Sequence, residues 1–234
     1  HHTEAQSSRT LSIGNPTDLD NGEFLLFGHD NGDISSWTTT NRPNGDVNVQ
    51  RIERVWRVDT TGGDPGSLTI TLSDSILPAP PGGFNTYNLW IDSDGDFNSG
   101  ATAIPLVSVG DDFVVNSVNL DDGIYITVGC ASPVVNFSLT SSSGLESVTD
   151  PAVEVSLNYA MNEEISVAFD AEDITAGGDS VDYLLNAGLA TFAAGENTTD
   201  IEPRIADDTI VELPDETFKI ILKTPDPGLS LGAD

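Results

Sequence analysis

The sequence has very little sulfur, histidine or positive charge. Its 234 residues include one cysteine, one methionine, three histidines, and only eight lysines and arginines together. Cys130 alone cannot form an intrachain disulfide, which excludes a disulfide-stapled scaffold but leaves secretion open. A structural zinc site is also excluded, because such sites need several Cys and His ligands.

Long apolar runs and a leader sequence are missing as well. No apolar stretch approaches the roughly 18 to 20 residues that a membrane-spanning helix needs, so we expect no membrane insertion. We interpret His1 and His2 as the end of a purification tag, followed by a linker through residue 8. This interpretation would place the natural N-terminus elsewhere.

Acidic residues are abundant: 38 Asp and Glu give a formal net charge of −30. Such a chain repels nucleic acid and anionic membranes, so neither is an expected partner. Carboxylates packed closely together stay ionised at low cost only with a cation among them. Acidity spread over the surface for solubility is the alternative, and it explains scattered acids better than clustered ones.

The sequence offers no catalytic constellation. His29 is the only histidine beyond the first two residues, and no nucleophile elbow lies near it. A pair of carboxylates for glycoside hydrolysis is available among so many acids, but no sequence feature selects one. We therefore expect that the protein is not an enzyme.

Short β-rich runs between turns of Gly, Asp, Asn and Pro predict an all-β fold. Leu68, Ile70 and Leu72 alternate with Ser and Thr, as in a half-buried strand. Runs of this kind through the first half favour a β-sandwich. The strands expected there are 9–14, 23–29, 48–59, 67–73, 86–91, 104–109, 113–119 and 124–129.

A second strand series begins after the segment 129–133, which ends in Ala-Ser-Pro. We therefore predict two tandem β-sandwich domains, residues 9–130 and residues 131–234. The strands expected in the second domain are 134–139, 152–157, 165–170, 190–192, 200–205 and 218–223.

Three motifs in the second half occur in a fixed order. Residues 169–183 read FDAEDITAGGDSVDY, residues 188–196 read GLATFAAGE, and residues 205–218 read IADDTIVELPDETF. The order "DY", then "G…F..GE", then "DD…E..E.F" resembles the Calx-beta family of sodium/calcium exchangers and bacterial surface proteins. The resemblance covers about 134–234 and implies an immunoglobulin-like sandwich with calcium sites at one end.

Carried over by motif, the resemblance implies a set of calcium ligands. Asp215 is an alternative to Glu216, since the spacing from Glu212 to Phe218 is one residue longer than in the exchangers, and Asp173 is a weaker candidate. Oxygen ligands from loops are also what calcium prefers on chemical grounds. A solvated acidic rim without metal is the alternative. The implied ligands are Glu146, Asp182, Asp207, Asp208, Glu212 and Glu216, with the carbonyl of Ile210.

The resemblance also implies one more strand after a "…LG" turn, whereas this sequence stops at 231–234, LGAD. We therefore expect that the last strand of the second domain is absent from this sequence, which would leave an open groove beside 218–223. A domain complete with fewer strands is the alternative.

The first half has an acidic loop of its own, residues 89–100, LWIDSDGDFNSG. Asp92, Asp94 and Asp96 have the alternate spacing of a calcium loop, but Phe97 stands where an EF-hand needs Gly. A calcium clip and an Asp-rich hairpin without metal both stay open. The stretches LLFGHDNGD, RIERVWRV, LWIDSDGDF and DDGIYITVG resemble a β-sandwich module of large Bacteroidetes-type surface proteins, including gliding adhesins.

These observations favour a calcium-binding structural or adhesive segment of a large secreted protein at the cell surface, with surface glycans or other adhesin segments as partners. Two other functions stay open. One is a carbohydrate-binding module that uses Trp37 or calcium at Asp92–Asp96, and the other is an accessory region of a secreted hydrolase. Trp56 and Trp90 lie within predicted strands, which favours a role in the core.

Overall fold

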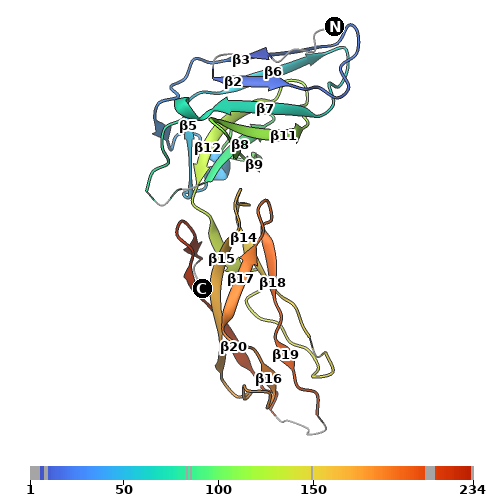
Figure 1. Cartoon of the computed structure of the whole chain (residues 1–234), viewed down its shortest axis with the longest axis vertical. Helices are drawn as coiled ribbons and strands as arrows, with labels where there is room; N and C mark the ends of the chain where they lie inside the picture. The colour runs from blue at the N-terminus through green and yellow to red at the C-terminus, as the bar shows by residue number, and fades with distance from the viewer. Residues whose placement is uncertain are drawn as a thin grey trace. The chain divides into compact units, whose positions relative to one another are not determined.

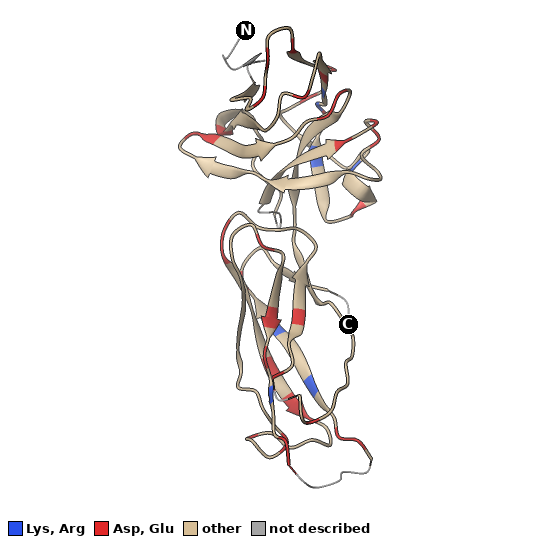
Figure 2. Ribbon diagram, turned by 90° about the vertical axis from the view of Figure 1, so that its right-hand side faces the viewer, with Lys and Arg blue, Asp and Glu red and all other residues tan. Residues whose placement is uncertain are grey.

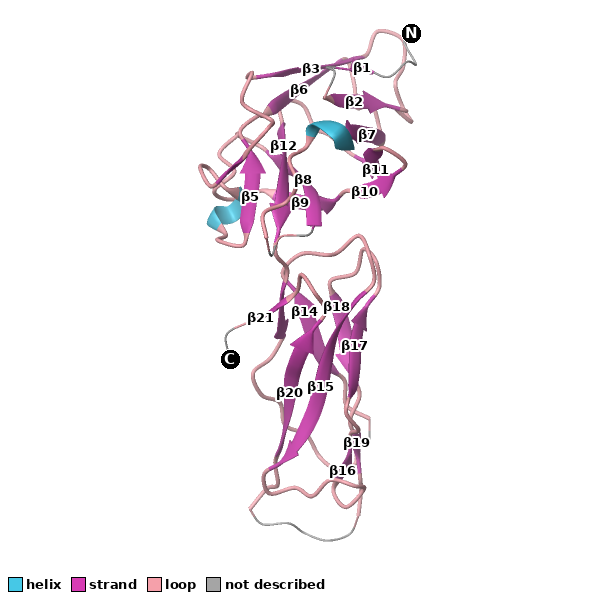
Figure 3. Ribbon diagram, turned by 60° about the vertical axis from the view of Figure 1, so that its left-hand side comes forward, coloured by secondary structure: helices cyan, strands magenta, loops and turns pink. Residues whose placement is uncertain are grey.

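The computed structural model describes residues 6–7, 10–82, 84, 86–148, 150–208 and 214–232. The chain divides into two units, His1–Ser132 and Pro133–Asp234, and the division falls within the segment 129–133 (Figure 1). Acidic residues occur in both units (Figure 2). The fold is all-β, and helix in the described residues is limited to two short 3-10 turns, Pro43–Gly45 and Asp74–Ile76 (Figure 3).

The first unit is a sandwich of two antiparallel sheets. One has the strand order β1-β2-β7-β11-β10; the other has the order β3-β6-β12-β5-β4, with β8 pairing both β12 and β9. The strands are β1 (Gln6–Ser7), β2 (Leu11–Gly14), β3 (Phe24–His29), β4 (Trp37–Thr38), β5 (Val49–Ile52), β6 (Trp56–Thr61), β7 (Leu68–Ser73), β8 (Thr86–Asp92), β9 (Thr102–Pro105), β10 (Val107–Val109), β11 (Asp112–Val118) and β12 (Tyr125–Ala131).

The core of this unit lies between the two sheets. On β7 the predicted alternation is present, with Leu68, Ile70 and Leu72 buried and the residues between them half-buried. Trp56 and Val58 of β6 belong to the same buried cluster. Burial of such a side chain contributes about 1.5–3 kcal/mol relative to exposure, so apolar packing holds the sheets together.

The single strand expected at 48–59 is instead two strands, β5 and β6. Both pair with the same edge of β12, but β5 pairs with residues 129–131 and β6 with residues 125–126. At the break, the Thr127 hydroxyl donates a 2.8 Å hydrogen bond to the carbonyl oxygen of Arg54. Between the two strands, a side-chain hydrogen bond therefore stands in for the backbone hydrogen bonds to β12. Strand propensity does not reveal such a break.

The second unit is an immunoglobulin-like β-sandwich. One sheet has the order β18-β14-β13-β21, the other has the order β17-β15-β20, and β16 and β19 form a separate pair. The strands are β13 (Val134–Phe137), β14 (Val153–Leu157), β15 (Ile165–Asp173), β16 (Tyr183–Leu184), β17 (Gly188–Phe192), β18 (Thr198–Ile201), β19 (Arg204–Ile205), β20 (Phe218–Pro225) and β21 (Ser230–Leu231), which runs parallel to β13.

The strand expected at 200–205 is also divided. β18 pairs with β14, whereas β19 pairs with β16. Pro203 stands between them and has no N–H to continue a ladder. This change of partner carries the chain from the sandwich to the small sheet beside the candidate site. In the part of the chain that the structure describes, no helix is both long and apolar enough to cross a membrane.

Candidate metal centre

The loop after β15 lies beside the residues that precede β20. These strands are antiparallel, and Asp173 at the end of β15 is opposite Phe218 at the start of β20. The backbone N–H groups of Thr175 and Ala176 both donate to the carbonyl oxygen of Thr217, at 2.9 and 3.0 Å. Two segments that are about forty residues apart in the sequence are therefore fastened together at one end of the sheet.

Asp182 is held firmly within this loop. Its backbone N–H donates to the Gly177 carbonyl at 2.9 Å, and its own carbonyl accepts from the Ala206 N–H at 2.8 Å. Its carboxylate Oδ2 accepts from the Gly177 N–H at 2.5 Å. The following residue, Tyr183, pairs with β19. Together these bonds place Asp182 beside the segment 206–208.

Two predicted calcium ligands, Asp182 and Glu146, act on a third, Glu216, which comes from another segment of the chain. The pKa of the exposed Glu216 carboxyl is raised, first by partial removal from water, then by its hydrogen bond with Asp182. The negative charges of Asp182 and Glu146 raise it further. Carboxylates in this situation repel one another, and a bound cation would relieve the repulsion.

The arrangement does not form a closed cage among the described residues. No three acidic, His or Cys side chains of this part of the chain stand as a ready metal site. Asp182 and Glu216 are within hydrogen-bond distance of each other, and Glu146 acts on Glu216 only through its charge. Ile210 and Glu212 lie outside the described residues. The donor set still fits calcium chemically, because it consists of carboxylate oxygens on loops.

Asp207 and Asp208 follow β19 after Ala206 and are exposed. Asp207 lines a shallow hollow together with Asp150, Ser180 and Arg204. The structure therefore places Asp207 beside a hollow that the Arg204 side chain also lines. Figure 2 shows acidic residues in the loops at this end of the unit.

Asp173, the weaker candidate, has a structural task. Its Oδ1 accepts hydrogen bonds from the Tyr183 hydroxyl at 2.5 Å and from the Gly178 N–H at 3.1 Å. The Tyr183 ring is buried and stacks on Phe218, with 4.0 Å between centroids and an interplanar angle of 11°. The tyrosine of the "DY" motif therefore anchors Asp173 at the end of β15.

In the acidic loop of the first unit, the carboxylates accept hydrogen bonds from other groups of the same loop. Oδ1 of the buried Asp92 accepts from the N–H groups of Asp94 and Gly95, at 3.0 and 2.6 Å. Oδ1 of Asp94 accepts from the Asp96 N–H at 2.8 Å, and Oδ1 of Asp96 accepts from Asn98 Nδ2 at 2.9 Å. The alternate spacing thus matches a chain of side-chain-to-backbone turns. These bonds suit the metal-free hairpin, and the calcium clip stays a prediction.

The aromatic residues singled out in the sequence are packed. Trp56, Trp90 and Phe97 are each 0% exposed. Trp37 is half-buried against the core of the first unit, and its Nε1–H donates to the Ala79 carbonyl at 2.8 Å. Trp37 therefore lies in the short strand β4 and does not stand free in a loop as a stacking platform.

Comparison with known proteins assigns both units. Residues 3–124 match the family model of a domain of unknown function, DUF8202. Residues 131–232 match the model of the Calx-beta domain. The chain belongs to the DUF8202 family and contains a Calx-beta domain.

Two solved structures are similar to the chain. The apo-form Calx CBD1 domain is 25% identical and has a TM-score of 0.40, with 43% of this chain and 87% of that chain covered. CBD12 from CALX1.2 is 16% identical and has a TM-score of 0.35, with 69% of this chain and 75% of that chain covered. A comparison with curated proteins gives no match.

Two features of the Calx-beta domain escaped sequence reasoning. Gly177 binds the Asp182 carboxylate through its backbone N–H, and its only signal in the sequence is the Gly-Gly pair before the "DY" motif. Arg204 lines the hollow beside Asp207. The only feature of the sequence that singles it out is that basic residues are scarce in so acidic a chain.

Proposed function

We propose that the chain is a calcium-binding structural or adhesive segment of a large secreted cell-surface protein. The observation that carries the proposal is the fastening of the loop after β15 to the residues before β20, where Asp182 and Glu216 share a hydrogen bond and Glu146 adds its charge. A calcium ion there would tie together the loop after β15, the segment before β20 and the loop that contains Glu146. Calcium would then act as the cross-link for a chain that has a single cysteine.

Composition supports this role. A net charge of −30 leaves many carboxylates that favour a cation-rich medium, and extracellular calcium suits modules that bind in the 10⁻⁴ to 10⁻³ M range. Two sandwich units in sequence, for which the amino-acid sequence predicts no catalytic constellation, favour a stalk or adhesive segment over an enzyme. Gliding adhesins are one class of surface protein to which such a segment would belong.

The proposal predicts that calcium stabilises the second unit. Binding only to the folded state adds about 2.7 kcal/mol when calcium is present at 100 times its dissociation constant. In a domain of this size, each kcal/mol raises the melting temperature by about 4–8 °C. Differential scanning calorimetry in calcium, in magnesium and in EDTA measures this. A second-unit transition at the same temperature in all three conditions would refute calcium binding.

A second candidate function is glycan binding by the first unit. It is favoured by a polar hollow on that unit, lined in part by Arg57, Asp59 and Tyr125. Partners would then be surface glycans, with calcium retained as a structural ion in the Calx-beta domain. An accessory region of a secreted hydrolase would use the same hollow, and a co-purified polysaccharide-cleaving domain in the native protein would favour that role.

A further inference from the structure

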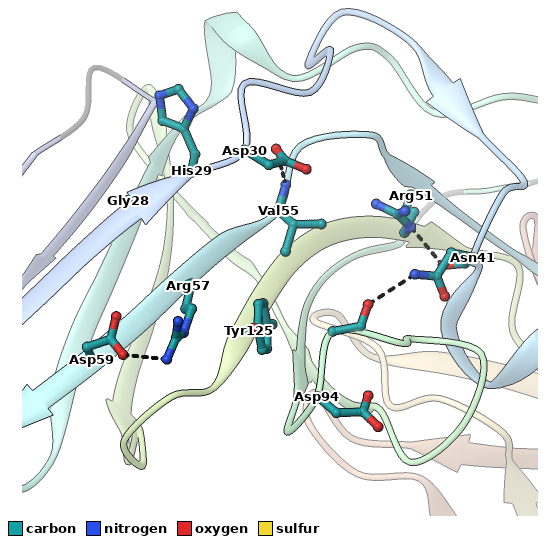
Figure 4. Close-up of a pocket in the computed structure, with 11 residues that line it drawn as sticks. Gly28, His29, Asp30, Asn41, Arg51, Val55, Arg57, Asp59, Asp94 and Tyr125 are labelled. Atoms are coloured by element: carbon teal, nitrogen blue, oxygen red, sulfur yellow. Dashed lines mark hydrogen bonds and ion pairs between the residues drawn. The ribbon is translucent and has the colours of Figure 1, made fainter.

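A hollow of about 620 Å³ opens on the first unit, within the size range of small-ligand sites (Figure 4). Its floor is one row of residues across three strands, because Gly28 of β3 and Tyr125 of β12 are both register partners of Arg57 on β6. An added Cβ at Gly28 would meet nothing within 4 Å, so the floor is open above this glycine.

Tyr125 presents a fixed aromatic surface in this hollow. Gly95 backs the ring so closely that a Cβ there would lie 3.2 Å from Tyr125 Cδ1. Arg57 Cζ lies 5.8 Å from the ring centroid. The side chain is half-buried, with Gly95 against the ring and the half-exposed Arg57 guanidinium over it, so a ligand that stacks on the ring takes the place of this guanidinium. An aromatic ring held this way can stack on the apolar face of a ligand at little cost in side-chain entropy.

Polar groups around the ring are also held in place. Arg57 forms an ion pair with Asp59 at 2.8 Å, and both side chains are about half exposed. On the opposite wall, Asn41 Nδ2 donates to the Gly95 carbonyl at 3.1 Å, and Arg51 Nε donates to the Asn41 carbonyl at 2.7 Å. The bonds of Asn41 and Arg51 hold that wall in place, and the half-exposed Arg57–Asp59 pair stands across the hollow from it (Figure 4).

The charges of the hollow nearly balance, in contrast to the chain as a whole. His29 accepts a hydrogen bond from the Asn31 N–H on Nδ1, which leaves Nε2–H as a donor in the neutral ring. Balanced charge with mixed donors and acceptors favours a neutral ligand with many hydroxyl groups over a phosphate or a lipid. The charged lining residues are the carboxylates Asp30, Asp59 and Asp94 and the guanidiniums Arg51 and Arg57.

Exposed apolar side chains continue the same face of β3. Leu26, opposite Asp59, is 66% exposed, and Phe24 is 59% exposed. Leu25 and Phe27, which alternate with them, pack against the core. Apolar surface beside the hollow would contact the next unit of a ligand longer than one sugar ring.

We propose that this hollow binds a neutral glycan, with Tyr125 stacking on a sugar ring while Arg57 and Asp59 bind its hydroxyl groups. The Arg57–Asp59 pair offers a donor next to an acceptor, which is the pattern that vicinal hydroxyls require. Binding at this site needs no metal ion.

The experiment uses the whole chain in EDTA, so that its outcome is independent of calcium binding by the second unit. Labelled protein is applied to an array of neutral gluco-, galacto-, manno- and xylo-oligosaccharides, and the oligosaccharide with the strongest signal is titrated by calorimetry. Arg57→Ala and Tyr125→Ala should each weaken binding about tenfold or more, whereas Tyr125→Phe keeps the ring and most of the affinity. Arg42→Ala is the matched control, because Arg42 belongs to the same unit and does not line the hollow.

The melting temperature of the first unit must match that of the unchanged protein for each variant. If Tyr125→Ala unfolds the unit, the oligosaccharide affinity of Arg57→Gln is measured in its place, and a loss of affinity is again expected. Absence of any signal from neutral oligosaccharides would overturn the proposal. So would full affinity in Arg57→Ala, or preferential binding of an anionic glycan.

Discussion

The Tyr183 hydroxyl donates a 2.5 Å hydrogen bond to Oδ1 of Asp173, at the end of the second unit where Asp182 and Glu216 meet. The same oxygen of Asp173 accepts the Gly178 N–H, so it also fixes the loop between them. Tyr183 is a positioning residue: it offers no ligand, but it holds the backbone that carries Asp182.

Replacing Tyr183 with Phe removes this hydrogen bond and keeps the stacked ring. We expect a loss of about 1 kcal/mol in the free energy of unfolding of the second unit, the usual net value of one hydrogen bond. Calcium affinity should fall as well, since the loop that carries Asp182 gains freedom. Denaturant unfolding and calcium titration measure the two effects. Tyr125→Phe, in the other unit, should change neither, and an unaltered calcium affinity in Tyr183→Phe would contradict the positioning role.

The same residue predicts an alkaline transition. Burial, followed by the hydrogen bond to Asp173, raises the pKa of Tyr183 to about 12 from 10.0. Because the folded-state pKa is the higher one, the stabilisation is fully present below pH 10 and is lost as the pH rises toward 12. The phenolate absorbance of the unchanged protein minus that of Tyr183→Phe should therefore rise near pH 12, and a difference centred near pH 10 would be inconsistent with this environment.

Cys130 should be unreactive in the folded protein. It is 0% exposed, and burial raises the pKa of its thiol to about 12. The thiolate, which is the reactive species, is then scarce near neutral pH. A colorimetric thiol reagent at pH 8 should label the protein only after denaturant is added. Rapid labelling without denaturant would show that β12 opens readily.

Asp92 should stabilise the first unit with or without calcium. Its buried carboxylate accepts two backbone N–H groups, which Asp92→Ala would leave without this partner. The expected cost is about 1–3 kcal/mol in the free energy of unfolding, measured in EDTA. Asp96→Ala, at an exposed position, should cost less. Stabilisation of the first unit by calcium would favour the clip over the metal-free hairpin.

Much of the fold could be predicted from local sequence patterns. Strands with clear alternation, such as β7, have their side chains on the expected faces, and the three motifs led to the Calx-beta domain. The division of 48–59 could not be predicted, because it depends on which stretch of β12 each half pairs with. The break at Pro203 was signalled by the residue itself, but the change of partner strand was not.

The two candidate sites also differ in how far the sequence predicts them. Glu146, Asp182 and Glu216 belong to a larger ligand set predicted through motif resemblance. Among these three, the charges of Asp182 and Glu146 act on the Glu216 carboxyl, and calcium binding by the set stays a prediction. The hollow of the first unit was not predicted. Its floor joins Gly28, Arg57 and Tyr125, which are distant in sequence and become neighbours only through strand register.

Calorimetric titration of calcium into the unchanged protein and into the double variant Asp182→Asn with Glu216→Gln tests the central claim most directly. Glu164→Gln is the matched control, since Glu164 is exposed and precedes β15 at its other end. The account predicts calcium binding to the unchanged protein and the control, and affinity about tenfold or more weaker in the double variant. It also predicts that the double variant is at least as stable in EDTA, because like charges have been removed. No calcium binding by the unchanged protein at millimolar concentration, or equal affinity in the double variant, would contradict it.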